Sequence, residues 1–176
     1  IYAYISDGAV QEEISQGVGR IAGSLGLNNL IVFYDANNVQ LSTKCDVVTT
    51  EDTAMKYRAW GWKVITIDGH DVDEIRHALD EATAEAERPT LIIGKTIMAK
   101  GAFKEDGSSY EHSVKTHGAP LGGAAYTYTI KHLGGSIENP FEIFEDVAQL
   151  YAQRKEQLNQ LVAERRATER AWREAN

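Results

Sequence analysis

Two polar side chains come just after short apolar segments of this sequence. Asp7 follows the segment 1–5, and Asn37 follows the segment 30–34. Both segments have the composition of buried strands, and the apolar repeat over 10–25 predicts an amphipathic helix between them. The three make one βαβ unit, so we expect both side chains at the carboxyl edge of a parallel sheet, where such sheets bind ligands. A carboxylate and an amide oxygen are hard ligands for Mg²⁺ or Ca²⁺, which would bridge to a diphosphate.

Gly8 fits the same chemistry. A residue without a side chain lets the backbone come close to phosphate oxygens, and the following helix offers free N–H groups and its positive dipole end. Asp7 alone would also fit a plain turn or a helix-capping aspartate. The joint placement of Asp7 and Asn37, each after a strand with one helix between, favours the metal and diphosphate site.

Strands and helices keep alternating after this unit. The expected segments are a helix at 49–60, a strand at 63–67, a helix at 71–87 and a strand at 90–96. Asp71 with Glu74 three residues later has the pattern of a capping box. The alternation predicts an α/β fold, a parallel sheet with helices on both faces.

The chain changes character after the last expected strand. Residues 101–139 are rich in glycine, carry His112 and His117, and predict a long ordered loop of the kind that often has a function. From residue 140 the pattern becomes that of a solvated amphipathic helix with charges of both signs. We therefore divide the chain into a domain over 1–139 and a helical extension over 140–176.

Composition bears on the binding partners and on the cellular compartment of the protein. The net charge of -8 gives no basic surface for nucleic acid. The sequence has no secretion signal and no apolar run able to span a membrane, and its single Cys45 cannot form an internal disulfide, so we expect a cytoplasmic protein. It begins inside an apolar run and stops inside a charged helical pattern, which we interpret as a chain cut at both ends.

The motifs resemble a known family. Ser6-Asp7-Gly8 followed by Asn37-Asn38 is similar to the Gly-Asp-Gly to Asn-Asn motif of thiamine-diphosphate enzymes. Segments similar to transketolases in order and spacing are 7–15, 29–35, 60–62, 68–71 and 117–121. The resemblance covers essentially the whole chain, and it implies an incomplete thiamine-diphosphate-binding fold.

The resemblance also implies roles for single residues. It makes the side chains of Asp7 and Asn37 and the backbone carbonyl of Val39 the protein ligands of the metal. It places Gly8 and His117 against the diphosphate, with His117 also near the reacting carbon, where an imidazole can donate to substrate hydroxyls or assist proton transfer. A histidine in a glycine-rich loop would otherwise be read as a structural residue.

Two further positions match the family less specifically. Met98 stands where the family has an aliphatic residue against the thiazolium ring, although core packing explains a methionine equally well. Glu12 matches a carboxylate at the dimer interface of the family, and it also fits a first-turn glutamate favoured by the helix dipole. The sequence departs from the family at Ser6, at Ala36 and at Ala99-Lys100, and none of these departures removes a metal ligand.

The implied reaction moves a two-carbon ketol unit from a ketose phosphate to an aldose phosphate by means of thiamine diphosphate and Mg²⁺ or Ca²⁺, in a homodimer. The glutamate that activates the aminopyrimidine and the basic residues that grip the sugar phosphate are absent, so we expect the 176 residues alone to be inactive. Another thiamine-diphosphate enzyme, such as a deoxyxylulose-phosphate synthase, and a split noncatalytic subunit are the alternatives. A nucleotide-binding module is disfavoured because neither of its glycine-rich signatures is present.

Overall fold

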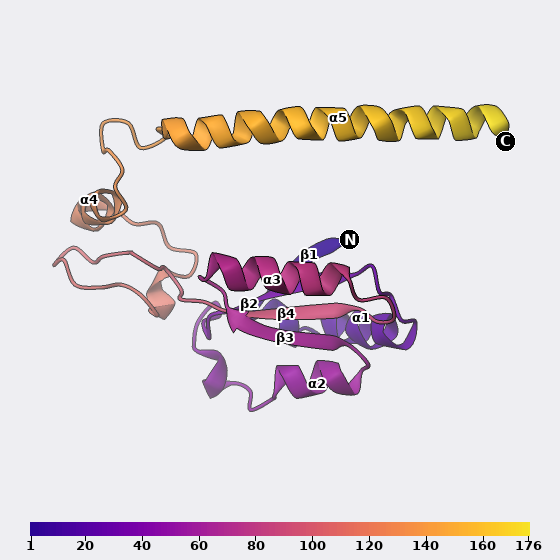
Figure 1. Cartoon of the computed structure of the whole chain (residues 1–176). Helices are drawn as coiled ribbons and strands as arrows, with labels where there is room; N and C mark the ends of the chain where they lie inside the picture. Colours follow the sequence, from indigo (N-terminus) through magenta and orange to yellow (C-terminus); the bar gives the residue numbers. More distant parts are fainter. The chain divides into compact units, whose positions relative to one another are not determined.

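The computed structural model describes residues 1–176 as two compact units, Ile1–Leu133 and Gly134–Asn176. The first unit holds a sheet with its helices, and the second holds one long helix (Figure 1). The division at 139/140 into a domain and a helical extension stays a prediction.

The sheet of the first unit has four strands, all parallel, in the order β1-β2-β4-β3. The strands are β1 (Tyr2–Ser6), β2 (Ile31–Ala36), β3 (Lys63–Asp68) and β4 (Thr90–Lys95). Their carboxyl ends therefore share one edge of the sheet, as the alternation of segments in the sequence predicts. The α/β class is confirmed.

Helices cover both faces of this sheet (Figure 1). The helices of the first unit are α1 (Glu13–Ser24), α2 (Thr53–Ala59), α3 (Val72–Thr83) and α4 (Gly123–His132), with short 3₁₀ turns η1 (Ala9–Gln11), η2 (Cys45–Val47) and η3 (Val114–Thr116). One core lies between the sheet and α1 and α2, and it includes Ala22, Tyr57 and Leu91. The other lies between the sheet and α3, around Ala78 and Ile92.

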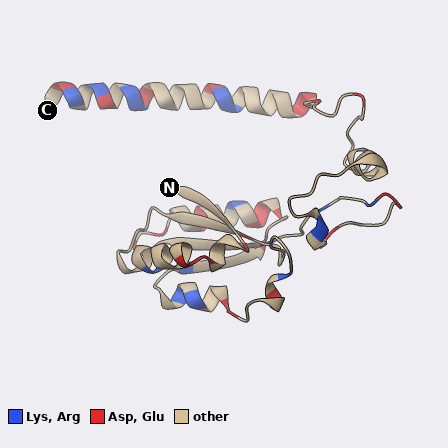
Figure 2. Ribbon diagram, turned by 180° about the vertical axis from the view of Figure 1, so that it is seen from behind, with Lys and Arg blue, Asp and Glu red and all other residues tan.

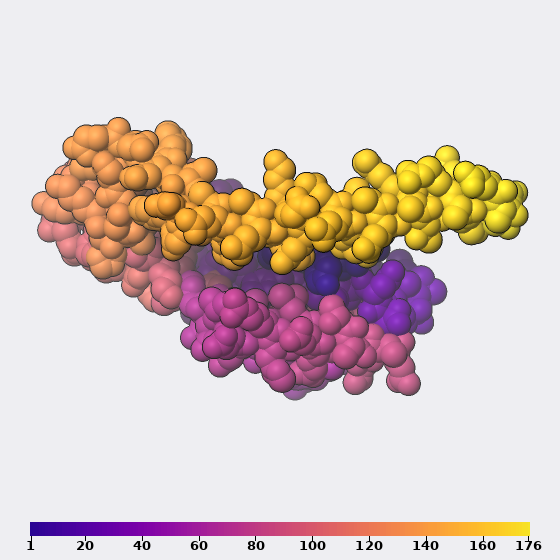
Figure 3. All heavy atoms as spheres, turned by 45° about the horizontal axis from the view of Figure 1, so that its top comes forward, coloured from indigo at the N-terminus to yellow at the C-terminus, as the bar shows by residue number.

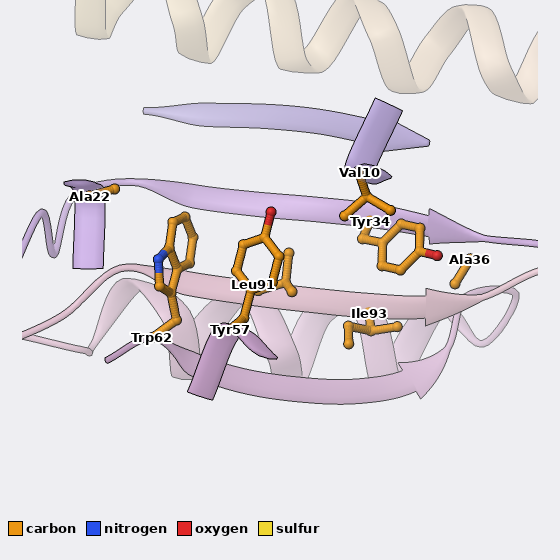
Figure 4. Packing of buried hydrophobic residues seen from close by; sticks show 8 residues of the cluster. All are labelled: Val10, Ala22, Tyr34, Ala36, Tyr57, Trp62, Leu91 and Ile93. Atoms are coloured by element: carbon orange, nitrogen blue, oxygen red, sulfur yellow. The ribbon is translucent and has the colours of Figure 1, made fainter. Parts of the chain in front are cut away.

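The core on the α1 side is built around aromatic rings. Tyr57 meets Trp62 edge to face with ring centroids 5.2 Å apart, and Trp62 Nε1 donates to the carbonyl of Gly19 at 2.7 Å (Figure 4). A Cβ on Gly23 would lie 1.8 Å from the carbonyl oxygen of Trp60. Gly23 therefore lets α1, the helix that follows Asp7, pack closely on its neighbours.

The environment of the first strand and helix differs from the sequence-based expectation. β1 is an edge strand rather than a buried one, with Tyr4 86% exposed, because only β2 pairs with it. In the predicted apolar repeat over 10–25, Val10 and Ala22 are buried as expected. The other four members form an exposed apolar stripe instead of a buried one: Ile14, Val18, Ile21 and Leu25.

Local chemistry sets the ends of the other helices. α2 is shorter than predicted because Asp52 accepts from the backbone N–H of Met55 and so starts the helix there. Asp71 caps α3 as predicted, but Glu74 accepts from the backbone N–H of Asp68 rather than completing a capping box. The glycine-rich segment 101–139 is not a continuous loop, because it contains α4.

The second unit consists mainly of α5 (Glu145–Ala175), whose residues include none that is buried. Charges of both signs alternate along it (Figure 2), and its side chains stand out from its surface in the space-filling view (Figure 3). The predicted helix is confirmed, although it begins at Glu145 rather than at residue 140. None of the helices combines the length and the apolar character that a membrane span requires.

Candidate functional site

A cavity of about 490 Å³ opens at the carboxyl edge of the sheet. Asp7 after β1, Asn37 after β2 and Thr96 after β4 all line it, so three neighbouring strands deliver polar side chains to one place. The remaining wall comes mainly from η2 and the segment leading to α2. This is the edge where the sequence places Asp7 and Asn37, and the structure brings them together.

Asp7 is buried, with 3% of its surface exposed, and both of its carboxylate oxygens are engaged. Oδ1 accepts from the hydroxyl of Tyr34 at 2.6 Å, and Oδ2 accepts from the backbone N–H of Asn37 at 2.8 Å. Neither η1 nor α1 has a side-chain cap bond, so Asp7 is not a helix-capping aspartate. A buried carboxylate held by two donors is an oriented ligand group.

Asn37 and Val39 form one turn beside Asp7. Asn37 Oδ1 accepts from the backbone N–H of Val39 at 2.9 Å, and Asn37 Nδ2 points to Asp35 Oδ1 at 3.4 Å. Asn38 between them adopts φ 63°, a left-handed conformation that asparagine tolerates. Asp7, Asn37 and Val39, the residues of the three expected metal ligands, are thus linked by direct hydrogen bonds.

Asp35 is tied to the third strand of the edge. Its Oδ1 also accepts a short hydrogen bond from the hydroxyl of Thr96, which follows β4. The amide of Asn37 therefore has its nitrogen directed toward a carboxylate and its oxygen toward a backbone N–H. These two contacts fix the direction in which the amide oxygen, the acceptor of the group, points.

Gly8 and Glu12 line a neighbouring cavity of about 460 Å³ together with residues 40–43. Gln11 stands between the two cavities, and its Nε2 donates to the carbonyl of Asp7 and to Oε1 of Gln40, both at 2.8 Å. Glu12 is exposed and occupies the position just before α1, where its side chain makes no cap bond. The first turn of α1 carries Glu13 instead, so the helix-dipole interpretation fits Glu13 better than Glu12.

His117 and Met98 are not among the residues that line the cavity around Asp7. His117 is half-buried at the end of η3, and its Nδ1 is buried without a hydrogen-bond partner. Met98 accepts, through its carbonyl, a hydrogen bond from the backbone N–H of His112 at 3.0 Å. His112 rather than His117 lines the cavity.

Several lining residues had no role in the sequence-based site. Tyr34 reads as an ordinary aromatic strand residue, Thr96 as the end of a strand and Cys45 as an isolated thiol. The signal that could reveal Tyr34 is its position in register: Tyr34 pairs with Ile5, two residues before Asp7. A long side chain at that position on the same face reaches the turn after β1.

Charge in the cavity is mostly negative. Asp7, Asp46 and Glu51 line it, against Lys95 as the only lysine or arginine, and Glu51 is paired with Lys56 at 2.5 Å. Burial and, after it, the Asp7 carboxylate raise the pKa of Cys45 to about 11. Burial, together with the bond to Asp7 and its charge, raises the pKa of Tyr34 far above its usual value. Both groups therefore stay protonated at neutral pH, and the surplus of carboxylates attracts cations.

The donors present fit a hard divalent cation that takes its remaining ligands from a diphosphate. No group of three or more His, Cys, Asp or Glu side chains is placed to hold a metal by itself. The expected set is instead one carboxylate, one amide oxygen and one backbone carbonyl, which leaves the other positions to water or phosphate oxygens. The unpartnered Nδ1 of His117 is a second polar atom that a ligand could satisfy.

The fold and this edge define an α/β domain of the class that binds ligands at the carboxyl ends of parallel strands. A family model described as "Transketolase, thiamine diphosphate binding domain" matches residues 1–175. The chain therefore belongs to the transketolase family, and it corresponds to the thiamine-diphosphate-binding domain of that family.

Relatives and solved structures agree with this assignment. The chain is 40% identical over 153 residues to transketolase 1 of Escherichia coli K12, covering 86% of this chain and 22% of that protein. It is 38% identical over 177 residues to transketolase 1 of Pasteurella multocida, covering 98% of this chain and 24% of that protein. The transketolase structure from Leishmania mexicana matches 94% of this chain and 24% of its own chain, with 29% identity and a TM-score of 0.82. The chain thus spans less than a quarter of these relatives.

Proposed function

We propose that this chain supplies the diphosphate- and metal-binding part of an enzyme that transfers a two-carbon ketol unit from a ketose phosphate to an aldose phosphate. The observation that carries the proposal is the buried meeting of Asp7 and Asn37 at the carboxyl edge of the sheet, in a chain of the transketolase family. We assign the protein to the cytoplasm and to the pentose phosphate pathway on the same family basis.

We extend the proposal to the residues that would hold the cofactor. Asp7 and Asn37 through their side chains and Val39 through its carbonyl would hold Mg²⁺ or Ca²⁺, and Gly8 and His117 would contact the diphosphate. Thiamine diphosphate, when bound, supplies a carbanion nucleophile and an electron sink. The protein contributes position: Asp7 is held by two donors, and Gln11 ties its backbone to the 40–43 loop.

His117 and Met98 would act on the side of the cofactor where the substrate reacts. The buried, unpartnered Nδ1 of His117 supports a role in which a bound group completes its hydrogen bonding. An imidazole there would donate to substrate hydroxyls or assist proton transfer near neutral pH. Met98 would pack against the thiazolium ring.

A homodimer is the assembly that the surface of α1 supports. Its exposed apolar stripe, in which Ile14 is 81% and Leu25 67% exposed, lies next to Glu12 at the start of the helix. Such a stripe on a soluble domain is typical of a protein interface. We propose that a second copy covers it, with Glu12 at the same interface.

The 176 residues alone would lack ketol-transfer activity. They contain neither the aminopyrimidine-activating glutamate expected from the family nor its sugar-phosphate-binding basic residues, so the site they form is partial. Turnover by the isolated chain that Asp7→Ala abolishes would overturn this part of the proposal.

The test of the function uses the native polypeptide that carries these residues, as wild type and as Asp7→Ala. Ketol transfer to ribose 5-phosphate is measured with thiamine diphosphate and Mg²⁺ present or withheld. We expect transfer that requires both and that Asp7→Ala reduces by at least about a hundredfold. Cofactor binding without transfer would move the reaction to another thiamine-diphosphate enzyme, and no cofactor binding would refute the site.

A further inference from the structure

Tyr34 places a buried hydroxyl on the carboxylate of Asp7. The side chain is 8% exposed, and its hydroxyl donates to Asp7 Oδ1 at 2.6 Å. That length lies in the range of charge-assisted O–H···O⁻ bonds, which are about twice as strong as neutral ones. The proposed function counts this contact among the two that hold Asp7 and gives Tyr34 itself no role.

The ring of Tyr34 is fixed by the core beneath the site. It belongs to the same packed cluster as Val10 and Ile93, and Figure 4 shows it beside Val10 at the carboxyl end of the strands. β2 holds the backbone by pairing with β1 on one side and β4 on the other. The position of the hydroxyl is therefore set by the sheet and its core, and it does not depend on a ligand.

The hydroxyl of Tyr34 has one acceptor within reach. A phenolic O–H donates its proton to a hydrogen-bond acceptor, and Asp7 Oδ1 is the acceptor present.

The second donor to Asp7 completes the arrangement. The backbone N–H of Asn37 bonds Oδ2 at 2.8 Å, so each carboxylate oxygen has one donor and the plane of the group is determined. A carboxylate oxygen has two lone pairs, and one on each oxygen stays free for a cation. The same N–H belongs to the second expected metal ligand, which couples the orientation of Asp7 to the position of Asn37.

We propose that Tyr34 is the positioning residue of the metal site, which holds the Asp7 carboxylate in the orientation that binds the divalent cation. The assignment rests on the proposed function, because it gives Tyr34 its role through Asp7. Groups that orient metal ligands in this way typically change metal affinity by about 10- to 100-fold when they are removed.

The test compares Tyr34→Phe with Tyr57→Phe in the native polypeptide. Both changes remove one hydroxyl from a buried tyrosine of the same core, and burial alone raises the pKa of Tyr57. Binding of thiamine diphosphate is followed by calorimetry while the concentration of Mg²⁺ is varied, and circular dichroism checks the fold. We expect Tyr34→Phe to need at least about tenfold more Mg²⁺ for half-maximal cofactor binding, and Tyr57→Phe to match the wild type.

Saturating Mg²⁺ separates positioning from a structural defect. If Tyr34 only orients Asp7, high Mg²⁺ restores full cofactor stoichiometry to Tyr34→Phe. A Tyr34→Phe protein with wild-type Mg²⁺ dependence, or one that no Mg²⁺ concentration restores, would overturn the assignment of Tyr34 alone. A wild type that binds no cofactor at any Mg²⁺ concentration would overturn the proposed function and this assignment with it.

Discussion

Gly8 adopts φ −69° and ψ −46°, a conformation open to any residue. A Cβ added there would meet only the Cβ of Gln40, at 3.9 Å, whereas one on Gly23 would collide with backbone at 1.8 Å. The fold therefore requires glycine at Gly23 and not at Gly8. A requirement for glycine at Gly8 would have to come from a ligand that approaches its backbone.

These two glycines make a matched pair of substitutions. We expect the free energy of unfolding of Gly8→Ala to stay within about 0.5 kcal/mol of the wild type. The same change should weaken thiamine diphosphate binding at least about tenfold, because the new methyl meets the diphosphate. Gly23→Ala should instead lower the free energy of unfolding by about 1–3 kcal/mol through overpacking. Urea unfolding and calorimetric cofactor titration give the two readouts. Unchanged cofactor affinity in Gly8→Ala would remove Gly8 from the site.

Cys45 gives the cavity a measurable pH dependence. With its pKa raised to about 11, about one thiol in a thousand is ionised at pH 8, against roughly one in four for an ordinary cysteine. The thiolate is the form that reacts with iodoacetamide. In EDTA buffer at pH 8, alkylation of Cys45 should therefore be about a hundredfold slower than alkylation of an ordinary cysteine. Its rate should keep rising with pH up to about pH 11. Mass spectrometry follows the reaction.

Asp7→Asn supplies the control for Cys45. The carboxylate of Asp7 raises the pKa of Cys45 because a negative charge disfavours a thiolate nearby. Its removal lowers that pKa, so alkylation at pH 8 should accelerate. A reaction that already levels off near pH 8.5 in the wild type would contradict the burial and charge described for this thiol.

Among the elements, β4 carries a polar atom that nothing satisfies. Thr90 is fully buried, and its Oγ1 has no hydrogen-bond partner. Thr90→Val replaces the hydroxyl by a methyl of similar size, so we expect the free energy of unfolding to rise by about 1 kcal/mol. Thermal and urea unfolding measure the change.

Thr129 in α4 is the matched control for Thr90. It is also buried, but its Oγ1 accepts from the backbone N–H of Phe103 at 2.9 Å. Thr129→Val leaves that N–H without a partner and should lower stability by about 1–3 kcal/mol. Equal effects of the two substitutions would mean that hydrogen bonding does not distinguish these hydroxyls.

The sequence predicts the strands well and their surroundings less well. The strands are short apolar runs bounded by turn-forming residues, so β3 and β4 could be placed to within one residue. The exposure of Ile14 and Val18 could not be predicted, because helical periodicity shows that a helix has an apolar face and not what covers it. α4 was missed because its alanines and tyrosines lie among glycines, which favour a loop.

For a similar reason, the sequence predicts only some of the residues that meet at the site. Asp7 and Asn37 meet because strand ends meet, which topology alone determines. Ser6 has no positive φ, so the departure there is without strain, whereas Ala99 adopts φ 55°, where glycine would be favoured. Tyr34 was not predicted, because its hydroxyl contact depends on the register between β1 and β2, and an aromatic strand residue is ordinarily core.

At the scale of the whole molecule, the apolar stripe of α1 predicts self-association. We expect the native polypeptide to be a dimer at micromolar concentration and Val18→Glu with Ile21→Glu to weaken that dimer at least about a hundredfold. A symmetric interface would meet each added charge twice, and like charges in contact cost several kcal/mol. Sedimentation velocity measures the change.

Met55 provides the control for this surface. It is 66% exposed on α2, outside the stripe, so Met55→Glu should leave the dimer intact. A double α1 variant that sediments like the wild type would show that another surface makes the dimer. The proposed cofactor site would be unaffected by that result.

The strand order has a consequence for protein synthesis. β4 lies between β2 and β3, although it is the last of the four strands to leave the ribosome. At about 5–20 residues per second, the growing chain carries one open edge on β2 and an unpaired β3 for several seconds before β4 can fill the gap. β3 is rich in β-branched residues, and open strand edges recruit other chains. The nascent sheet is therefore exposed to aggregation at this gap until β4 emerges.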